Sequence, residues 1–199
     1  MKICVYAISK NEEKHVKRWV ESMKEADEIY VLDTGSTDNT KKKLEELGVK
    51  VTQKIISPWR FDVARNESLN LVPTDTDICI CTDLDEVFEP GWRKQLELQW
   101  TKNTTRAKYN YNWSLDKNNT PIVNFYIEKI HTRHNYKWTH PVHEVLEFTG
   151  EIENTITLKN ITLNHYPDST KSRKSYLPLL ELSVKEDPEN DRKRTIFMS

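Results

Sequence analysis

Three carboxylates crowd the stretch Asp83-Leu84-Asp85-Glu86, which follows the apolar run Ile78–Cys81. Like charges this close repel one another and shift each other's pKa values unless a cation or hydrogen-bond donors lie among them. Asp83 and Asp85 are two residues apart, so an extended backbone points both side chains to one side and Leu84 away. Oxygen ligands of this kind suit Mg²⁺ or Mn²⁺, whose remaining positions are filled by water and phosphate. The alternative is an acidic turn that leads into the next helix.

The elements that would position these carboxylates alternate between strand and helix patterns along residues 1–100. The expected strands are 3–8, 28–32, 49–56 and 77–82. The expected helices are 12–26, 61–71 and a segment that Ser36 or Thr37 caps and that ends at Leu47, before Gly48. This alternation predicts an α/β fold with a mostly parallel sheet and right-handed crossovers.

Polar clusters follow three of these expected strands, at residues 9–12, 33–36 and 83–86. In a parallel sheet the carboxyl ends of the strands lie along one edge, and ligands bind beyond that edge. Strand polarity alone therefore predicts that the three clusters come together.

The second half of the chain has a different amino-acid composition. After Gly91 a short helix is expected to run to Trp100, and residues 105–165 are then rich in Tyr, Trp, Thr, Asn and His. Strand patterns cover 107–113, 121–130, 142–148 and 156–163, with a hairpin turn at 116–119, and a last helix is expected at 172–185. We expect a more antiparallel half.

Composition narrows the class of protein. A chain of 199 residues suits a single α/β domain, here 1–199, and a net charge of -1 gives no reason to expect nucleic acid as a partner. The three cysteines lie in strand-like runs, where we expect them to be buried, and their number and spacing favour a reducing compartment.

Neither a signal peptide nor a transmembrane segment is recognisable, which predicts a cytoplasmic location. The abrupt end at Ser199 leaves open that the chain is the N-terminal part of a longer protein.

Four motifs in the first half resemble those of inverting family 2 glycosyltransferases of the GT-A fold, a Rossmann-like sheet. They are ISKNEE, DTGSTDNT, FDVARNESL and DLDE, each after or on its expected element and in the family's order. PVHEVLEF and LNHYPDSTKSRKSYLPLLE resemble later elements more loosely. The resemblance implies a nucleotide-binding half at 1–100 and an acceptor-binding half at 101–199.

The resemblance also implies a reaction. A sugar would move from a nucleoside-diphosphate donor, UDP-linked, to an acceptor hydroxyl with inversion, and Mn²⁺ or Mg²⁺ would stabilise the departing diphosphate. A glycan, a lipid or a protein side chain all fit as the acceptor.

Particular residues receive roles from the same resemblance. Asp33 would accept a hydrogen bond from N3 of uracil, Arg65 would face the base or the diphosphate, and Asp85 would bind the metal. His165 is a candidate further metal ligand. The whole nucleotide-binding set is Ala7, Ser9, Glu12, Asp33, Arg65, Asp83 and Leu84.

Each role has a structural alternative. Asp33 could simply begin the DTGS turn, Arg65 could be a helix-surface charge paired with a neighbouring acid, and Glu12 could be an acid in the first turn of a helix. His165 could be a structural histidine.

The second half must supply the base that takes the proton from the acceptor. Glu144, in His140-Pro141-Val142-His143-Glu144, is the candidate catalytic residue. The alternative is a glutamate at the edge of a strand with no role in catalysis.

Two other functions compete with a glycosyltransferase. A sugar-phosphate nucleotidyltransferase would need a glycine-rich, basic loop after the first strand, where SKNEE stands instead. A non-catalytic carbohydrate-binding domain would suit the aromatic second half, including Trp113.

Overall fold

The structure is a computed structural model that describes residues 1–168 and 176–188. Its helices are α1 Val16–Met23, α2 Thr40–Glu46, α3 Phe61–Asn70, α4 Trp92–Gln99 and α5 Leu177–Glu186. Its strands are β1 Ile3–Ser9, β2 Glu28–Asp33, β3 Lys50–Gln53, β4 Ile78–Cys81, β5 Glu86–Phe88, β6 Arg106–Leu115, β7 Pro121–Thr132, β8 Tyr136–Thr139, β9 Val145–Phe148 and β10 Thr155–His165.

One large sheet runs through the described residues in the order β3-β2-β1-β4-β7-β6-β10-β5. The first four strands in this order are parallel to one another. Strand β7 then runs antiparallel to both β4 and β6, and β5 runs antiparallel to β10, although β10 and β6 are parallel. The expected α/β fold, with a parallel first half and a more antiparallel later half, is confirmed.

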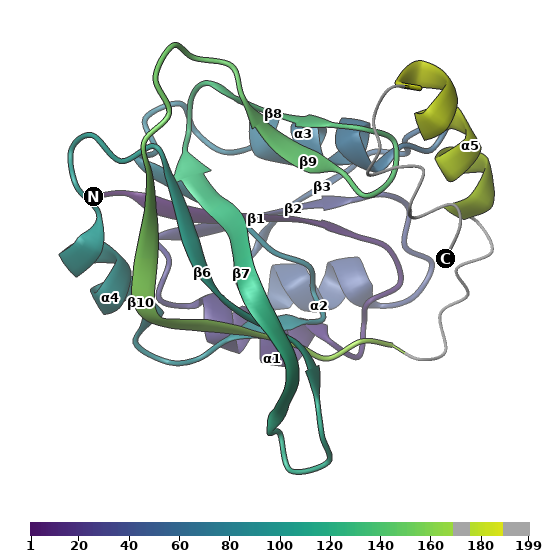
Figure 1. Ribbon diagram of the computed structural model, residues 1–199. Helices are drawn as coiled ribbons and strands as arrows, with labels where there is room; N and C mark the ends of the chain where they lie inside the picture. Colours follow the sequence, from purple (N-terminus) through teal and green to yellow (C-terminus); the bar gives the residue numbers. More distant parts are fainter. Residues whose placement is uncertain (169–175, 189–199) are drawn as a thin grey trace.

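Alternate side chains along β1 belong to two separate hydrophobic cores. Ile3, Val5 and Ala7 pack on the side of α1, α2 and α4, in a core that also contains Trp19. Cys4 and Tyr6 point to the opposite side, where α3 and the small sheet β8-β9 cover them. Figure 1 shows these layers, with α1 and α2 below the sheet and α3, β8 and β9 above it. The sheet is therefore buried on both faces, as a parallel sheet requires.

A buried chain of hydrogen bonds joins the small sheet to the large one. The indole N–H of Trp138 on β8 donates to the hydroxyl of Tyr6 at 2.9 Å, and this hydroxyl lies 2.9 Å from Nε2 of His131 on β7. The other ring nitrogen of His131 lies 2.7 Å from the carbonyl oxygen of Thr132 and donates to it. Because a carbonyl can only accept, Nε2 is the acceptor for Tyr6.

Several expected boundaries were wrong in detail. The first helix begins at Val16 rather than at Glu12. The second helix has Asn39 at its N-cap, not Ser36 or Thr37, because the Ser36 hydroxyl bonds to Asp33 instead. Strands β5 and β8, of three and four residues, were not expected. The end of the second helix is confirmed, with Gly48 in the left-handed conformation at φ 83°.

The β6–β7 hairpin extends beyond the sheet and carries exposed side chains; we call its outer part, residues 113–126, the arm (Figure 1). The expected turn is present at its tip, where Oδ1 of Asp116 accepts the backbone N–H groups of Asn118 and Thr120, both at 2.8 Å.

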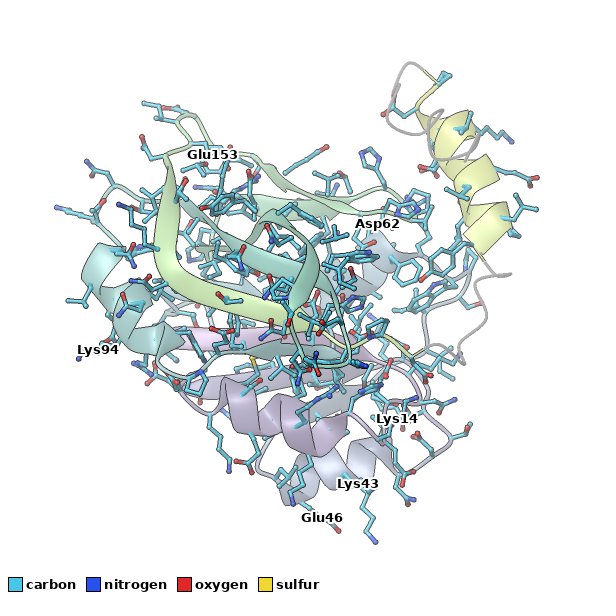
Figure 2. All side chains as sticks on the ribbon, turned by 60° about the horizontal axis from the view of Figure 1, so that its bottom comes forward. Lys14, Lys43, Glu46, Asp62, Lys94 and Glu153 are labelled. Carbon is cyan, nitrogen blue, oxygen red and sulfur yellow. The ribbon has the colours of Figure 1, made fainter. Side chains whose placement is uncertain are left out.

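The last described helix, α5, is tied to α3. Arg60 donates to Asp62 at the start of α3 and also forms an ion pair with Glu186 on α5, and Figure 2 shows Asp62 on the side of α3 that faces α5. The last helix was expected at 172–185, and its first part, 172–175, lies outside the described residues.

All three cysteines are buried and free, as expected. Within the described ranges, no helix combines the length and the apolar character that crossing a membrane requires.

Candidate functional site

The three polar strand ends do lie along one edge of the sheet. In the parallel register of β1 and β2, Ser9 is paired with Asp33. Strand β4 lies on the other side of β1, with Cys81 beside Tyr6, so the DLDE turn leaves the sheet at the same edge. The expected convergence of these clusters is confirmed.

Asp33 is fully buried and its carboxylate is surrounded by donors. Oδ1 accepts the backbone N–H groups of Gly35 and Ser36 and the amide of Gln53, and Oδ2 accepts the hydroxyls of Ser9 and Ser36. Burial alone would raise the pKa of Asp33, but these hydrogen bonds outweigh it and lower the pKa below its usual value. Asp33 thus shapes the DTGS turn, and a base could bond to it only if one of these donors moved aside.

The other positions assigned to the nucleotide are engaged within the protein. The hydroxyl of Ser9 is engaged with Asp33, and the backbone N–H of Glu12 donates to Oγ1 of Thr40 at 2.7 Å. The side chains of Ala7 and Leu84 lie in the hydrophobic core. A nucleotide contact from either of these two would therefore have to come from its backbone.

The DLDE turn is held by its own last residue. Glu86 is 1% exposed; its Oε2 accepts the backbone N–H of Asp83 at 2.8 Å and its Oε1 accepts the hydroxyl of Tyr111 at 2.8 Å. Lys129 of β7 donates to Oε1 of Glu86 at 3.1 Å and lies 3.4 Å from Oδ2 of Asp83. One ammonium group thus keeps two neighbouring carboxylates together.

The pKa shifts of these groups follow from burial and charge. Burial raises the pKa of Glu86 above its usual value, although the attraction of Lys129 opposes this. Burial acts in the same direction on Asp83, but the charges of Arg65 and Lys129 overcome it and hold the pKa of Asp83 well below its usual value. Burial works against the ammonium of Lys129, yet Glu86 and Asp83 raise its pKa. Asp83 is therefore ionised at neutral pH.

Arg65 joins the DLDE turn to the candidate base. Its side chain is 5% exposed; Nη2 lies 2.7 Å from Oδ1 of Asp83 and Nε donates to Oε1 of Glu144 at 2.8 Å. The guanidinium also lies over the ring of Trp138, 5.5 Å from its centroid. Arg65 is thus a buried cation paired with Asp83 and Glu144, not a helix-surface charge paired with Glu67 or Asp62.

Glu144 comes from the loop between β8 and β9 rather than from a strand. His140 and His143 in this loop have positive φ angles of 76° and 51°, which non-glycine residues seldom adopt. The carbonyl of Pro141 accepts the backbone N–H of Phe61, so the loop is fastened to the start of α3. The side chain of Glu144 is 13% exposed, and one guanidinium separates it from Asp83.

Asp85 faces His165, which is the last residue of β10. Nε2 of His165 lies 3.5 Å from Oδ2 of Asp85, while Nδ1 lies 2.9 Å from the carbonyl oxygen of Trp113 and donates to it. Burial opposes the charged form of His165, but the bonds to Asp85 and Trp113 raise its pKa. In the neutral ring the bond to the carbonyl keeps the proton on Nδ1, so Nε2 then carries a lone pair that a metal beside Asp85 could accept.

A divalent metal fits this pair as part of its coordination shell. Within residues 1–168 and 176–188, no cluster of three or more His, Cys, Asp and Glu side chains could hold a metal ion. Asp85 and His165 offer one oxygen and one nitrogen. Ions such as Mg²⁺ are commonly bound by one or two protein groups together with substrate phosphates and water.

Lys129 was not predicted to belong to the site. The segment Tyr126-Ile127-Glu128-Lys129-Ile130 reads as an ordinary strand, and no local feature reveals that β7 lies beside β4. Glu86 was noticed as one of the three acids, but not as the group that holds Asp83. Trp113, named above for the aromatic second half, is 43% exposed.

Comparison with curated proteins finds relatives that are all described as uncharacterized glycosyltransferases. The protein from Rickettsia bellii is 42% identical over 97 residues, which is 48% of this chain and 32% of that protein. The one from Rickettsia conorii is 44% identical over 59 residues, which is 29% of this chain and 20% of that protein. The matches thus span about a third or less of the length of these curated relatives.

Among solved structures, glucosyl-3-phosphoglycerate synthase from Mycobacterium tuberculosis is similar. Its complex with Mn²⁺, UDP and glucosyl-3-phosphoglycerate has a TM-score of 0.46 and 25% identity, over 55% of this chain and 44% of that one. Its complex with Mn²⁺, UDP and phosphoglyceric acid has a TM-score of 0.49 and 21% identity, over 66% and 56% of the two chains.

The sequence model of one family matches most of the chain. Its description is Glycosyl transferase family 2, and the match covers residues 4–148 of the 199. It includes Asp33, Arg65, the DLDE turn and Glu144, and it ends before His165. The chain therefore belongs to glycosyl transferase family 2.

Proposed function

We propose that this protein transfers a sugar from a UDP-sugar to an acceptor hydroxyl, with inversion at the anomeric carbon and with the help of Mn²⁺ or Mg²⁺. Family membership supports the class of reaction. The single observation that carries the metal-dependent form is the pair Asp85–His165, because its Nε2 lone pair and carboxylate face each other 3.5 Å apart at the ligand-binding edge of the sheet.

Asp85 and His165 would hold the metal, which when bound would neutralise the charge that develops on the leaving diphosphate. The nucleoside is proposed to lie over the ends of β1 and β2, against Ser9, the Glu12 loop and Asp33. Because Asp33 is already saturated by donors, we expect Ser36 or Gln53 to exchange its bond for the base when the nucleotide binds.

Glu144 is proposed to take the proton from the acceptor hydroxyl. The acceptor oxygen attacks the anomeric carbon as the bond to the diphosphate breaks, UDP leaves on the opposite face, and the proton stays on Oε1 or Oε2 of Glu144. Arg65 is proposed to be a positioning residue. Its guanidinium contacts both Glu144 and Asp83, which keeps the base close to the turn that would hold the donor.

The direct test is UDP release from UDP-glucose, UDP-galactose and UDP-N-acetylglucosamine in the presence of Mn²⁺. Slow transfer to water makes this readout independent of the unknown acceptor. We expect release with at least one donor, and a loss of at least about 100-fold in Asp85→Asn. The matched control is Asp75→Asn, which removes a surface carboxylate that pairs with Lys2. Absence of release with every donor, or equal release by Asp85→Asn, would refute the proposal.

A further inference from the structure

A cavity of about 410 Å³ lies next to the proposed metal site, between α1, the arm and the end of β10. This volume lies within the range of about 300–1,000 Å³ that is typical of small-molecule sites. His165 forms part of its wall, and the backbone N–H of the next residue, Tyr166, donates to the carbonyl of Asp85 at 2.8 Å. A molecule in this cavity therefore lies against His165, one of the two proposed metal ligands.

The wall of the cavity combines apolar residues, Leu115, Tyr166 and Pro167, with several polar side chains. The arm contributes the hydroxyl of Ser114, the carboxylate of Asp116 and the amide of Asn119, and α1 contributes the guanidinium of Arg18. Arg18 lies over the ring of Tyr166, 4.1 Å from the ring centroid. A phosphorylated or carboxylated ligand would call for several converging cations. Here Arg18 is the only guanidinium among the lining residues, beside the carboxylate of Asp116 and the imidazoles of His15 and His165, and it already lies 3.3 Å from Nδ1 of His15.

The turn of the arm is held by hydrogen bonds to Asp116. Its Oδ1 accepts two backbone N–H groups, and its carboxylate also accepts a side-chain hydrogen bond from Thr120. Asn119 occupies the left-handed region at φ 61°, where its backbone is set by the turn. The carboxylate and the amide on the turn, together with the hydroxyl of Ser114 on β6, offer the donors and acceptors that a polyhydroxylated ring can bond.

An exposed aromatic face adjoins these groups. The ring of Trp113 stacks on His165, with centroids 4.7 Å apart and an angle of 27° between the planes, yet the residue is 43% exposed. Phe125, 46% exposed, packs at 5.5 Å against Tyr111 on the same side of the arm. The C–H face of a pyranose ring loses contact with water when it lies on such a surface.

We propose that this cavity is a subsite for a neutral saccharide, and that the acceptor of the reaction is accordingly a carbohydrate whose sugar contacts Ser114, Asp116, Asn119 and Arg18. The acceptor role rests on the proposed function, whereas the binding of a neutral sugar in the cavity does not. The arm is then the element that selects the acceptor.

The test is saturation-transfer NMR with the full chain in the presence of UDP and Mg²⁺. The probes are methyl glucoside, methyl galactoside, N-acetylglucosamine, maltose, lactose and cellobiose, with glucose 6-phosphate as the anionic comparison. We expect at least one neutral sugar to bind and to compete better than glucose 6-phosphate. Ser114→Phe, which fills the cavity, and Asn119→Gly, which removes the amide at a φ that glycine tolerates, should each weaken this binding at least tenfold.

The matched control is Tyr126→Ser, on the same arm but not part of the cavity wall. It should bind the sugar as the unaltered protein does. The inference is overturned if none of the neutral sugars binds, if glucose 6-phosphate binds more tightly, or if both cavity variants bind as well as the control. Thermal stabilisation of the unaltered protein by UDP-glucose and Mn²⁺, measured in parallel, tests the proposed function alone. Sugar binding without nucleotide binding would refute the proposed function and leave the saccharide site standing.

Discussion

Arg65 is the residue on which the electrostatics of the candidate site depend most. It is buried and contacts two carboxylates, Asp83 and Glu144, which lie 18 and 79 positions further along the chain. Removing one partner of a buried ion pair lowers the free energy of unfolding by more than the intact pair contributes to it, because the remaining charges stay desolvated.

We therefore expect Arg65→Met to lower the free energy of unfolding by about 3 kcal/mol, the lower end of the range for buried pairs, since Asp83 is 35% exposed. Urea denaturation measures this loss. Lys42→Met is the control, because it removes an exposed cation 3.9 Å from Glu46 on α2 and should leave the stability nearly unchanged. A loss for Arg65→Met as small as that of the control would contradict the assigned role.

Glu144 gives a prediction about rate rather than stability. Glu144→Gln keeps an oxygen that can accept the bond from Nε of Arg65, but the amide cannot take up a proton. We expect kcat to fall about 10²–10⁴-fold, with KM for the donor and the unfolding midpoint little changed. Steady-state UDP release measures this, with Glu147→Gln, an exposed position on β9, as the control. An unaltered kcat would mean that the base lies elsewhere.

At the scale of elements, β8 is held to β1 and β7 through a histidine that must stay neutral. Burial lowers the pKa of His131 to about 3, against an ordinary value of 6.5. Between these values the unfolded chain binds one more proton than the folded one, so stability falls as the pH falls. The contribution is complete above pH 6.5 and is lost on the way down to about pH 3.

Between about pH 6 and pH 5, above the range in which most carboxylates titrate, this loss approaches about 1.4 kcal/mol per pH unit. Chemical denaturation at several pH values measures the slope. His131→Gln should flatten it, whereas His134→Gln, at an exposed position, should not. Because the pKa of His165 is raised above 6.5, His165 makes the stability fall as the pH rises above that value. It therefore cannot produce a loss of stability between pH 6 and pH 5. Equal slopes in both variants would contradict the account.

The elements that the sequence predicted well are those whose partners follow from local pattern and chain direction. Ser9, Asp33 and Asp83 could be placed on one edge because parallel strands share an orientation. Lys129 and the Arg65–Glu144 contact could not, because they depend on β7 lying beside β4 and on the β8–β9 loop reaching α3. Such pairings over long sequence distances are settled by packing, and a single strand pattern carries no information about its neighbour.

At the scale of the whole molecule, metal and nucleotide should stabilise the fold together rather than separately. Asp85 and His165 would supply two ligands, and the described residues hold no cluster of three or more possible ligands, so phosphates and water would have to complete the coordination shell. We expect Mn²⁺ alone to raise the unfolding temperature little, and UDP with Mn²⁺ to raise it strongly; a ligand at 100 times its Kd contributes about 2.7 kcal/mol. Thermal unfolding with and without EDTA measures this, and Asp85→Asn should abolish the joint effect. Purely additive shifts would contradict it.

The most direct test of the account is a crystal of the protein grown with UDP-glucose and Mn²⁺, with data collected at the manganese absorption edge. The account predicts one anomalous peak in contact with both Oδ2 of Asp85 and Nε2 of His165, with the diphosphate oxygens completing its shell. A manganese peak at another place, or a nucleotide bound with Asp85 and His165 making no contact to the metal, would contradict it.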